Sequence, residues 1–94
     1  IIDLLTPVVL AHLIMGDGNF KLDANTVRIY TNGFSLSDNN RLASAIMAKL
    51  GIYVEVKHDR RNQYILSIGP KELRKLQELV SPHMHSSMLY RIGL

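Results

Sequence analysis

The helix predicted near the N-terminus constrains this chain more than any other feature, because it is apolar on nearly every side. Thr6 and Pro7 favour a helix start, since threonine can cap the first free amides and proline suits the first helical position. We expect the helix to run from Pro7 to about Met15 and to end in the Gly-Asp-Gly sequence at 16–18. A short helix that is apolar all round is buried on both sides. It must therefore pack on the core of its own domain and also contact a second surface.

The two apolar sides of this helix differ in bulk. One stripe consists of large aliphatic side chains, namely Val9, Leu10, Leu13 and Ile14. The other stripe consists of Val8, Ala11, His12 and Met15. The small Ala11, together with Gly16 at the helix end, suits the close approach of another helix. We therefore predict that the bulky stripe fills the core and that the other stripe contacts a partner helix.

The rest of the chain predicts two pairs of strands, each pair followed by a helix. The strands are expected over residues 19–23, 27–32, 52–57 and 63–68. Helices are expected over residues 38–50, capped by Ser35 or Ser37, and 70–80, followed by a short tail over 83–94. Four antiparallel strands with helices on one face form an α+β layer, and residues 1–94 are expected to form one domain.

The outer face of the predicted sheet is polar. In the strand at 27–32, β-branched residues alternate with Arg28 and Tyr30, which must then point away from the core. The same reasoning predicts a polar face and hairpin tip, the candidates for ligand contact, made of Lys21, Arg28, Tyr30, Asn32, Lys57, Gln63, Arg60 and Arg61. Asp23 and Glu55 fall on this face too, so the surface is mixed in charge rather than strongly positive.

Composition narrows the class of protein. Lys and Arg number 11 against 8 acidic residues, a net charge of +3 that suits a polyanionic partner without requiring one. The absence of cysteine excludes disulfides and thiolate metal sites. No apolar run approaches the roughly 20 residues of a membrane-spanning helix. Because the chain begins at Ile1 and not at methionine, we expect it to be a piece of something longer.

Residues 10–18 read Leu-Ala-His-Leu-Ile-Met-Gly-Asp-Gly and resemble the nine-residue signature of the LAGLIDADG homing endonucleases and intron maturases. The matching positions are Leu10, Ala11, Leu13, Ile14, Asp17 and Gly18. The segments 34–38, 63–65 and 81–91 also resemble the C-terminal half of the two-motif, organelle intron-encoded members. The resemblance covers essentially the whole chain. It implies a homing-endonuclease-like αββαββα module, which agrees with the element order predicted above.

The resemblance also implies a paired active site. In that family two modules pack through their signature helices, as a homodimer or with a companion half, and a carboxylate from each helix end binds Mg²⁺ at the scissile phosphates. Carried over to this chain, the catalytic and metal-binding carboxylate is Asp17, with the carbonyl of Gly16 as a second candidate ligand. Oxygen ligands of this kind suit Mg²⁺. Without the resemblance, Asp17 between two glycines is equally typical of a turn.

The implied partner is double-stranded DNA, because the sheets of two paired modules form a saddle over the major groove, which admits a two-stranded ribbon. On the polar face, Arg and Lys would contact guanine or phosphate, and Asn and Gln would pair with adenine. The implied setting is an organelle, the mitochondrion, without membrane association. These are the expectations that the family resemblance adds to the residue patterns.

The chain departs from the family pattern at two signature positions and in one later segment. His12 stands where glycine is frequent, and Met15 where an acid is frequent, although neither position is the metal ligand. Some members carry a lysine shortly after the third helix, and residues 83–87 contain none. These departures leave an alternative open, in which the module binds RNA as a maturase or as a structural part of a ribonucleoprotein, such as an organelle ribosome, and does not cleave.

Overall fold

The helices and strands follow the predicted order. The computed structural model describes residues 4–94. The elements are α1 (Pro7–Asp17), β1 (Gly18–Lys21), β2 (Thr26–Ile29), α2 (Leu36–Leu50), β3 (Glu55–Arg60), β4 (Gln63–Ile68) and α3 (Pro70–Val80), followed by the 3-10 helices η2 (Ser81–His83) and η3 (Ser86–Ile92). Thr6 caps α1 by accepting from the amide of Val9 at 3.2 Å. Ser35, not Ser37, caps α2 by accepting from the amide of Asp38 at 3.0 Å.

Helix α1 extends two residues further than predicted. It includes Gly16 and Asp17, and the amide of Gly18 donates to the carbonyl of Ile14. A Cβ atom at Gly18 would lie 2.6 Å from that carbonyl oxygen, so the direct passage from α1 into β1 requires a glycine there. Asp17 is therefore the last residue of the helix and immediately precedes the sheet, and the reading of Asp17 as a residue of a separate turn is wrong.

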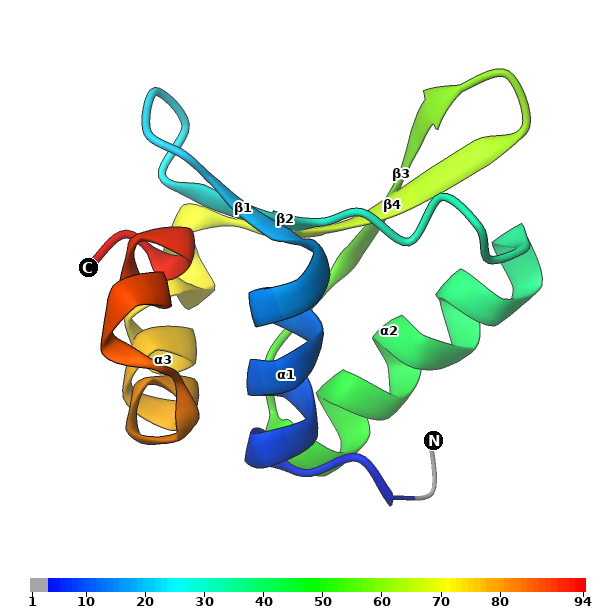
Figure 1. The fold of residues 1–94 in the computed structure, drawn as a ribbon. Coiled ribbons are helices and arrows are strands. Elements are labelled where there is room, and N and C mark those ends of the chain that lie inside the picture. Colours follow the sequence, from blue (N-terminus) through cyan, green and yellow to red (C-terminus); the bar gives the residue numbers. More distant parts are fainter. Residues whose placement is uncertain (1–3) are drawn as a thin grey trace.

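The four strands form one antiparallel sheet in the order β1-β2-β4-β3. In Figure 1 the three α-helices lie under one face of this sheet, and no helix of the described chain covers the other face. The β1–β2 and β3–β4 hairpins rise away from the helices at opposite ends (Figure 1). The predicted α+β architecture is confirmed, and the uncovered face is concave between the two hairpins.

Strand β3 begins later in the chain than predicted, at Glu55 and not at residue 52. The reason is that Ile52 and Val54 are buried in the core before strand pairing starts, which accounts for their apolar character. The strand then continues through Arg60, so this arginine belongs to β3 and not to the loop. The turn itself is shorter than the expected 58–62 loop and contains Arg61 in the left-handed region, at a φ of 49°.

The core lies between the sheet and the helices, and it contains aliphatic residues of every α-helix. Its most buried members include Leu10, Ile14, Val27, Ile29, Ile46, Leu66, Ile68, Leu76 and Val80. The polar side chain of Asn39 in α2 is fully buried with them, and it accepts from the hydroxyl of Thr31 and donates to the carbonyl of Ser35 at 3.1 Å. These bonds satisfy the buried amide and hold the segment after β2 against α2.

Candidate nucleic-acid interface

The strand register places the predicted polar residues on the uncovered face of the sheet. One row crosses all four strands, because Asn19 pairs with Arg28, Arg28 with Ser67, and Ser67 with Glu55. Paired residues point to the same face. Their neighbours along β2 and β4 are fully buried core residues, so this row faces away from the helices. Lys57, two residues beyond Glu55 on β3, shares the face.

Arg28 lies near the centre of this row and has no partner. Its side chain is half-buried, it makes no hydrogen bond or ion pair within residues 4–94, and its Nε atom is buried and unsatisfied. A buried donor without an acceptor is costly. The surface at Arg28 is thus suited to an acceptor from outside the chain, such as a phosphate oxygen or the O6 and N7 atoms of guanine.

A hydrogen-bonded cluster lies where β3 and β4 extend beyond the helices. Asn32 Nδ2 is 2.8 Å from Asp59 Oδ2 and 3.3 Å from Gln63 Oε1. Arg60 Nε lies 3.7 Å from the same carboxylate oxygen of Asp59. Asp59 was not identified from the sequence, because the pairing register of β3 shifts between His58 and Arg60 and the simple alternation of strand residues stops there.

The tip of the β3–β4 hairpin is stabilised by contacts along one side. The ring of His58 meets the carbonyl of Arg61 and lies edge-on to Tyr64, with ring centroids 5.4 Å apart. These contacts hold the turn that contains Arg61. Lys57 and Glu55 form an exposed ion pair at 3.9 Å, which contributes little to stability and leaves the lysine available to an anion.

Lys21 and Tyr30 lie at the two ends of the β1–β2 pair. Lys21 is half-buried and pairs with Thr26 beside the turn. Tyr30 follows the last residue of β2, and its amide donates to the carbonyl of Asp17 at 2.9 Å. This bond ties the end of α1 to the sheet, so the candidate metal carboxylate lies next to the polar face and not apart from it.

A basic residue contacts the chain next to Asp17, although residues 83–87, where some family members carry a lysine, contain no lysine. Arg91, in η3, donates from Nη1 to the carbonyl of Gly18 at 2.6 Å, and its Nε is buried without a partner. The segment is anchored by Gln77, whose Nε2 donates to the carbonyl of Ile92 at 2.7 Å. Arg91 is the last residue of the segment 81–91, which resembles the family. Only the folded chain shows that it reaches the residue next to Asp17.

The metal-binding groups predicted from the sequence are accessible but few. Asp17 and Gly16 are both exposed at the end of α1, and a Cβ atom at Gly16 would meet nothing within 4 Å. A carboxylate and a backbone carbonyl are oxygen donors of the kind that Mg²⁺ prefers. Within residues 4–94, however, no three His, Cys, Asp or Glu side chains gather around a point. Asp17 and Gly16 could therefore supply only part of a coordination shell, and further oxygens would come from another chain, a second module, a phosphate or water.

The outward side of α1 matches the predicted partner stripe except at Ala11. Val8 is 42% exposed, and His12 and Gly16 are exposed as well, one helical turn apart in each step. His12 Nδ1 lies 2.8 Å from the carbonyl of Val8, which orients the ring along the helix. Met15 is half-buried, and its Sδ atom accepts from the backbone amide of His85 at 3.5 Å.

Ala11 is the correction to this stripe. Its side chain is 0% exposed and belongs to the core, so Ala11 cannot contact a partner helix directly. The physical reason is the helical period, since Ala11 lies one turn before the buried Ile14 and beside the buried Leu10.

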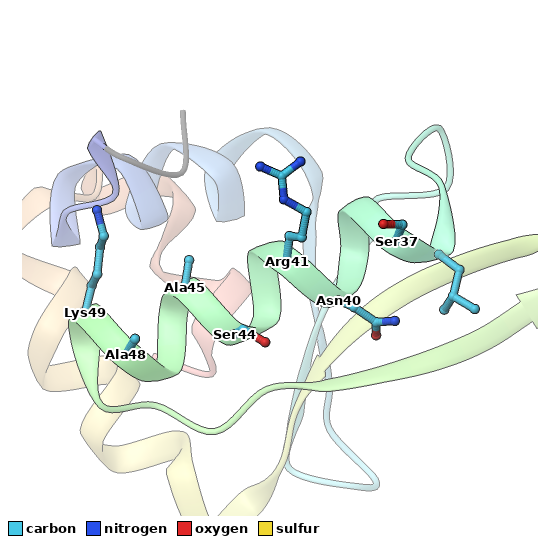
Figure 2. Close-up of a pocket in the computed structure, with 8 residues that line it drawn as sticks. Ser37, Asn40, Arg41, Ser44, Ala45, Ala48 and Lys49 are labelled. Atoms are coloured by element: carbon cyan, nitrogen blue, oxygen red, sulfur yellow. The ribbon is translucent and has the colours of Figure 1, made fainter.

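A shallow depression on the outer side of α2 has no connection with these sites. Its lining residues are Leu36, Ser37, Asn40, Arg41, Ser44, Ala45, Ala48 and Lys49. Figure 2 shows small side chains along the middle of the helix, with Arg41 and Lys49 extending from it. None of the residues predicted to bind metal, nucleic acid or a partner helix lies there, and we assign no ligand to it.

Comparison with known proteins agrees with this combination of a bare polar sheet face and an acidic helix end. Residues 1–76 match the model of the LAGLIDADG DNA endonuclease family. The chain therefore belongs to that family. Endonucleases of this family generally depend on a divalent metal ion.

Two relatives and one solved structure give the extent of the similarity. The chain is 28% identical over 93 residues to "Probable intron-encoded DNA endonuclease 3" of Mycosarcoma maydis, and 28% identical over 86 residues to "Intron-encoded endonuclease ai4" of Dictyostelium discoideum. The solved structure of the homing endonuclease I-WcaI bound to its DNA recognition sequence matches 94% of the chain with a TM-score of 0.85 and 24% identity, which supports the fold. The chain spans 67%, 53% and 41% of the lengths of these three proteins. Within residues 4–94, no helix is long and apolar enough to cross a membrane.

Proposed function

We propose that this chain is one half of a site-specific DNA homing endonuclease and that its uncovered sheet face binds the major groove of duplex DNA. The observation that carries the proposal is Arg28, whose guanidinium has no partner within residues 4–94 and lies at the centre of a concave face with the family's fold. The remaining predicted contacts on this face come from Lys21, Tyr30, Asn32, Lys57, Arg60, Arg61 and Gln63. A ribbon of two antiparallel strands fits the major groove and can reach the base edges.

Asp17 and the carbonyl of Gly16 are proposed to hold Mg²⁺ at the end of α1. When bound, the ion would stabilise charge on the scissile phosphate as a Lewis acid. Arg91 is held beside this point by its bond to the carbonyl of Gly18. Its remaining N–H groups would bind phosphate oxygens and so position the backbone at the carboxylate.

A second module is proposed to dock on α1 through Val8, His12, Met15 and Gly16. The support is twofold: Asp17 and the carbonyl of Gly16 supply only part of a metal site, and the chain covers only 41% of the solved homing endonuclease I-WcaI, which leaves room there for another module. The names of two relatives describe intron-encoded enzymes. This supports an organelle as the setting, and we propose the mitochondrion.

The RNA-binding alternative loses one of its reasons. It was motivated partly by the lack of a basic residue in 83–87, and Arg91 provides such a residue from a later position. The alternative remains a possible outcome of the experiment that follows.

The proposal is tested by incubating the protein, assembled with its second half, with a random duplex library and with RNA from its source. We expect enrichment of one discrete duplex site and, with Mg²⁺, its cleavage. Arg28→Ala should weaken binding to that site by about 5- to 150-fold, the range for one good base contact. The control is Lys71→Ala, an exposed lysine of α3 on the helix side of the sheet. Selection of intron or ribosomal RNA without any duplex site would contradict the endonuclease and favour the RNA role.

A further inference from the structure

The side-chain amide of Asn32 has both of its protons engaged inside the protein. Nδ2 carries two protons, and its two acceptors are Asp59 Oδ2 at 2.8 Å and Gln63 Oε1 at 3.3 Å. Asn32 Oδ1 has no partner within the described part of the chain. Asn32 can therefore offer only an acceptor to a ligand on the sheet face.

Asp59 is the group that fixes this orientation. A carboxylate accepts hydrogen bonds and cannot donate them, so it can hold only the NH₂ side of the Asn32 amide and never its oxygen. The side chain of Asp59 is 24% exposed, which keeps the bond partly sheltered from water. Arg60, at 3.7 Å, offsets the negative charge that this acid would otherwise present to a polyanion.

We propose that Asp59 is a positioning residue that sets the base preference at one position of the DNA site through Asn32. The inference rests on the proposed function, since it presupposes that the sheet face meets duplex DNA. An asparagine that pairs with adenine in two bonds needs both a donor and an acceptor. Asn32 keeps only its acceptor, so it reads a single exocyclic amino group, N6 of adenine or N4 of cytosine. A thymine or guanine would set O4 or O6 against Asn32 Oδ1, acceptor against acceptor.

Gln63 differs from Asn32, because its acceptor is used inside the protein and its donor is free within the described chain. Its Oε1 is used by Asn32, and no described residue accepts from its Nε2. The free donor would contact an acceptor such as N7, O6 or O4 on a neighbouring base. The expectation that the asparagine and glutamine of this face each pair with adenine is thereby replaced by a split pair, in which Asn32 accepts and Gln63 donates.

The test exchanges the polarity of residue 59 in the protein assembled with its second half. In Asp59→Asn the side-chain amide of residue 59 can either accept from Asn32 Nδ2, as the carboxylate does, or donate to Asn32 Oδ1, so the Asn32 amide is no longer restricted to one orientation. Binding is measured on duplexes that carry each base pair at every position of the site, and Asn32→Ala identifies the position read by Asn32. We expect the preference for adenine or cytosine there to fall by at least about fivefold, the low end for one base contact, as guanine and thymine become accepted as well.

Two variants separate this effect from loss of charge or of folding. Asp59→Ala should flatten the preference at that position without reversing it. Glu55→Gln removes one negative charge from the same sheet face and should change affinity and its salt dependence equally for all four base pairs. A general weakening without a change of preference would mean that Asp59 is merely structural.

A second measurement needs no nucleic acid. In the wild-type protein, the two Nδ2 proton resonances of Asn32 should be distinct and slow to exchange with water, and in Asp59→Ala they should exchange much faster. A freely rotating Asn32 amide in the wild type overturns the inference. An unchanged base preference in both Asp59→Asn and Asp59→Ala, in a protein that binds and cuts one duplex site, overturns it as well while leaving the proposed function intact. If no duplex site is bound at all, the proposed function itself is wrong, and the inference with it.

Discussion

The end of α1 and the outer end of the β3–β4 hairpin are both polar, but they differ in how complete they are within one chain. At the hairpin, Asn32 donates to both Asp59 and Gln63, which holds its amide in a defined orientation. At the helix end, Asp17 is exposed, and within the described chain no group of three or more His, Cys, Asp or Glu side chains could hold a metal ion. Under the proposed function, the chain would arrange its recognition surface alone, whereas its reaction site would require another module.

The largest effect is expected at Asp17, at the end of α1. Asp17→Asn keeps the size of the side chain but removes the charge that a divalent cation needs. We expect cleavage by the assembled protein to fall by at least about a hundredfold, as when one main electrostatic group is lost from an active site, with binding nearly unchanged. Single-turnover cleavage and a gel-shift titration measure the two quantities.

A matched control for that variant is Asp38→Asn, which removes an exposed carboxylate from the start of α2. Its ion pair with Arg41, at 3.8 Å, lies on the surface and contributes little. Equal loss of cleavage in both variants would show that charge in general, and not a metal ligand at Asp17, is responsible.

The second prediction compares two glycines at the end of α1. A methyl group at Gly18 would meet the backbone of Ile14 at 2.6 Å, so Gly18→Ala should lower the free energy of unfolding by about 1–3 kcal/mol, as overpacking does. Gly16→Ala meets nothing within 4 Å and should leave the fold intact or stabilise it by up to about 1 kcal/mol, because alanine favours helix. Chemical denaturation measures both.

Gly16→Ala also distinguishes the stability of the isolated chain from its association with a second module. If the second module approaches α1 closely at Gly16, the added methyl group should weaken association of the two halves even though the isolated chain is as stable as before. Association can be followed by analytical ultracentrifugation of separately produced halves. Unchanged association would place the partner elsewhere than on the Val8, His12 and Gly16 side of α1.

A smaller effect is expected at Arg91. Arg91→Lys keeps one positive charge but cannot both donate to the carbonyl of Gly18 and keep several N–H groups for phosphate. We expect cleavage to fall by roughly tenfold, the loss of one hydrogen bond to a charged group, with less change in binding. A loss confined to binding would make Arg91 a docking contact and separate it from Asp17.

The smallest effect is expected at Lys57. Lys57→Ala removes only an exposed pair with Glu55, so the free energy of unfolding should change by less than about 0.5 kcal/mol. If Lys57 contacts a phosphate, the slope of log affinity against log salt should decrease by about one. An unchanged slope would remove Lys57 from the DNA surface.

Local patterns in the sequence were enough for the order of the elements and for the outer face of the sheet. Thr6 and Pro7 start α1 through bonds within four residues, and the alternation around Arg28 separates core from surface because strand side chains have a period of two. The signature at 10–18 led to the family, and the match over residues 1–76 confirms it. Such features depend on neighbours in the chain, so they can be read before the chain is folded.

Contacts between distant residues were decided only by the tertiary structure. The register shift in β3 brings Asp59 to Asn32 across 27 positions, and packing of η3 against β1 brings Arg91 to Gly18 across 73. Ala11 was assigned to a partner surface because a small residue fits either a close helix contact or a crowded core, and the core of this chain takes it. Sequence by itself determined which residues carry charge, a carboxylate or an amide. Folding decided which of these groups meet and which are left free, because that depends on strand register and packing and not on the residues next to them.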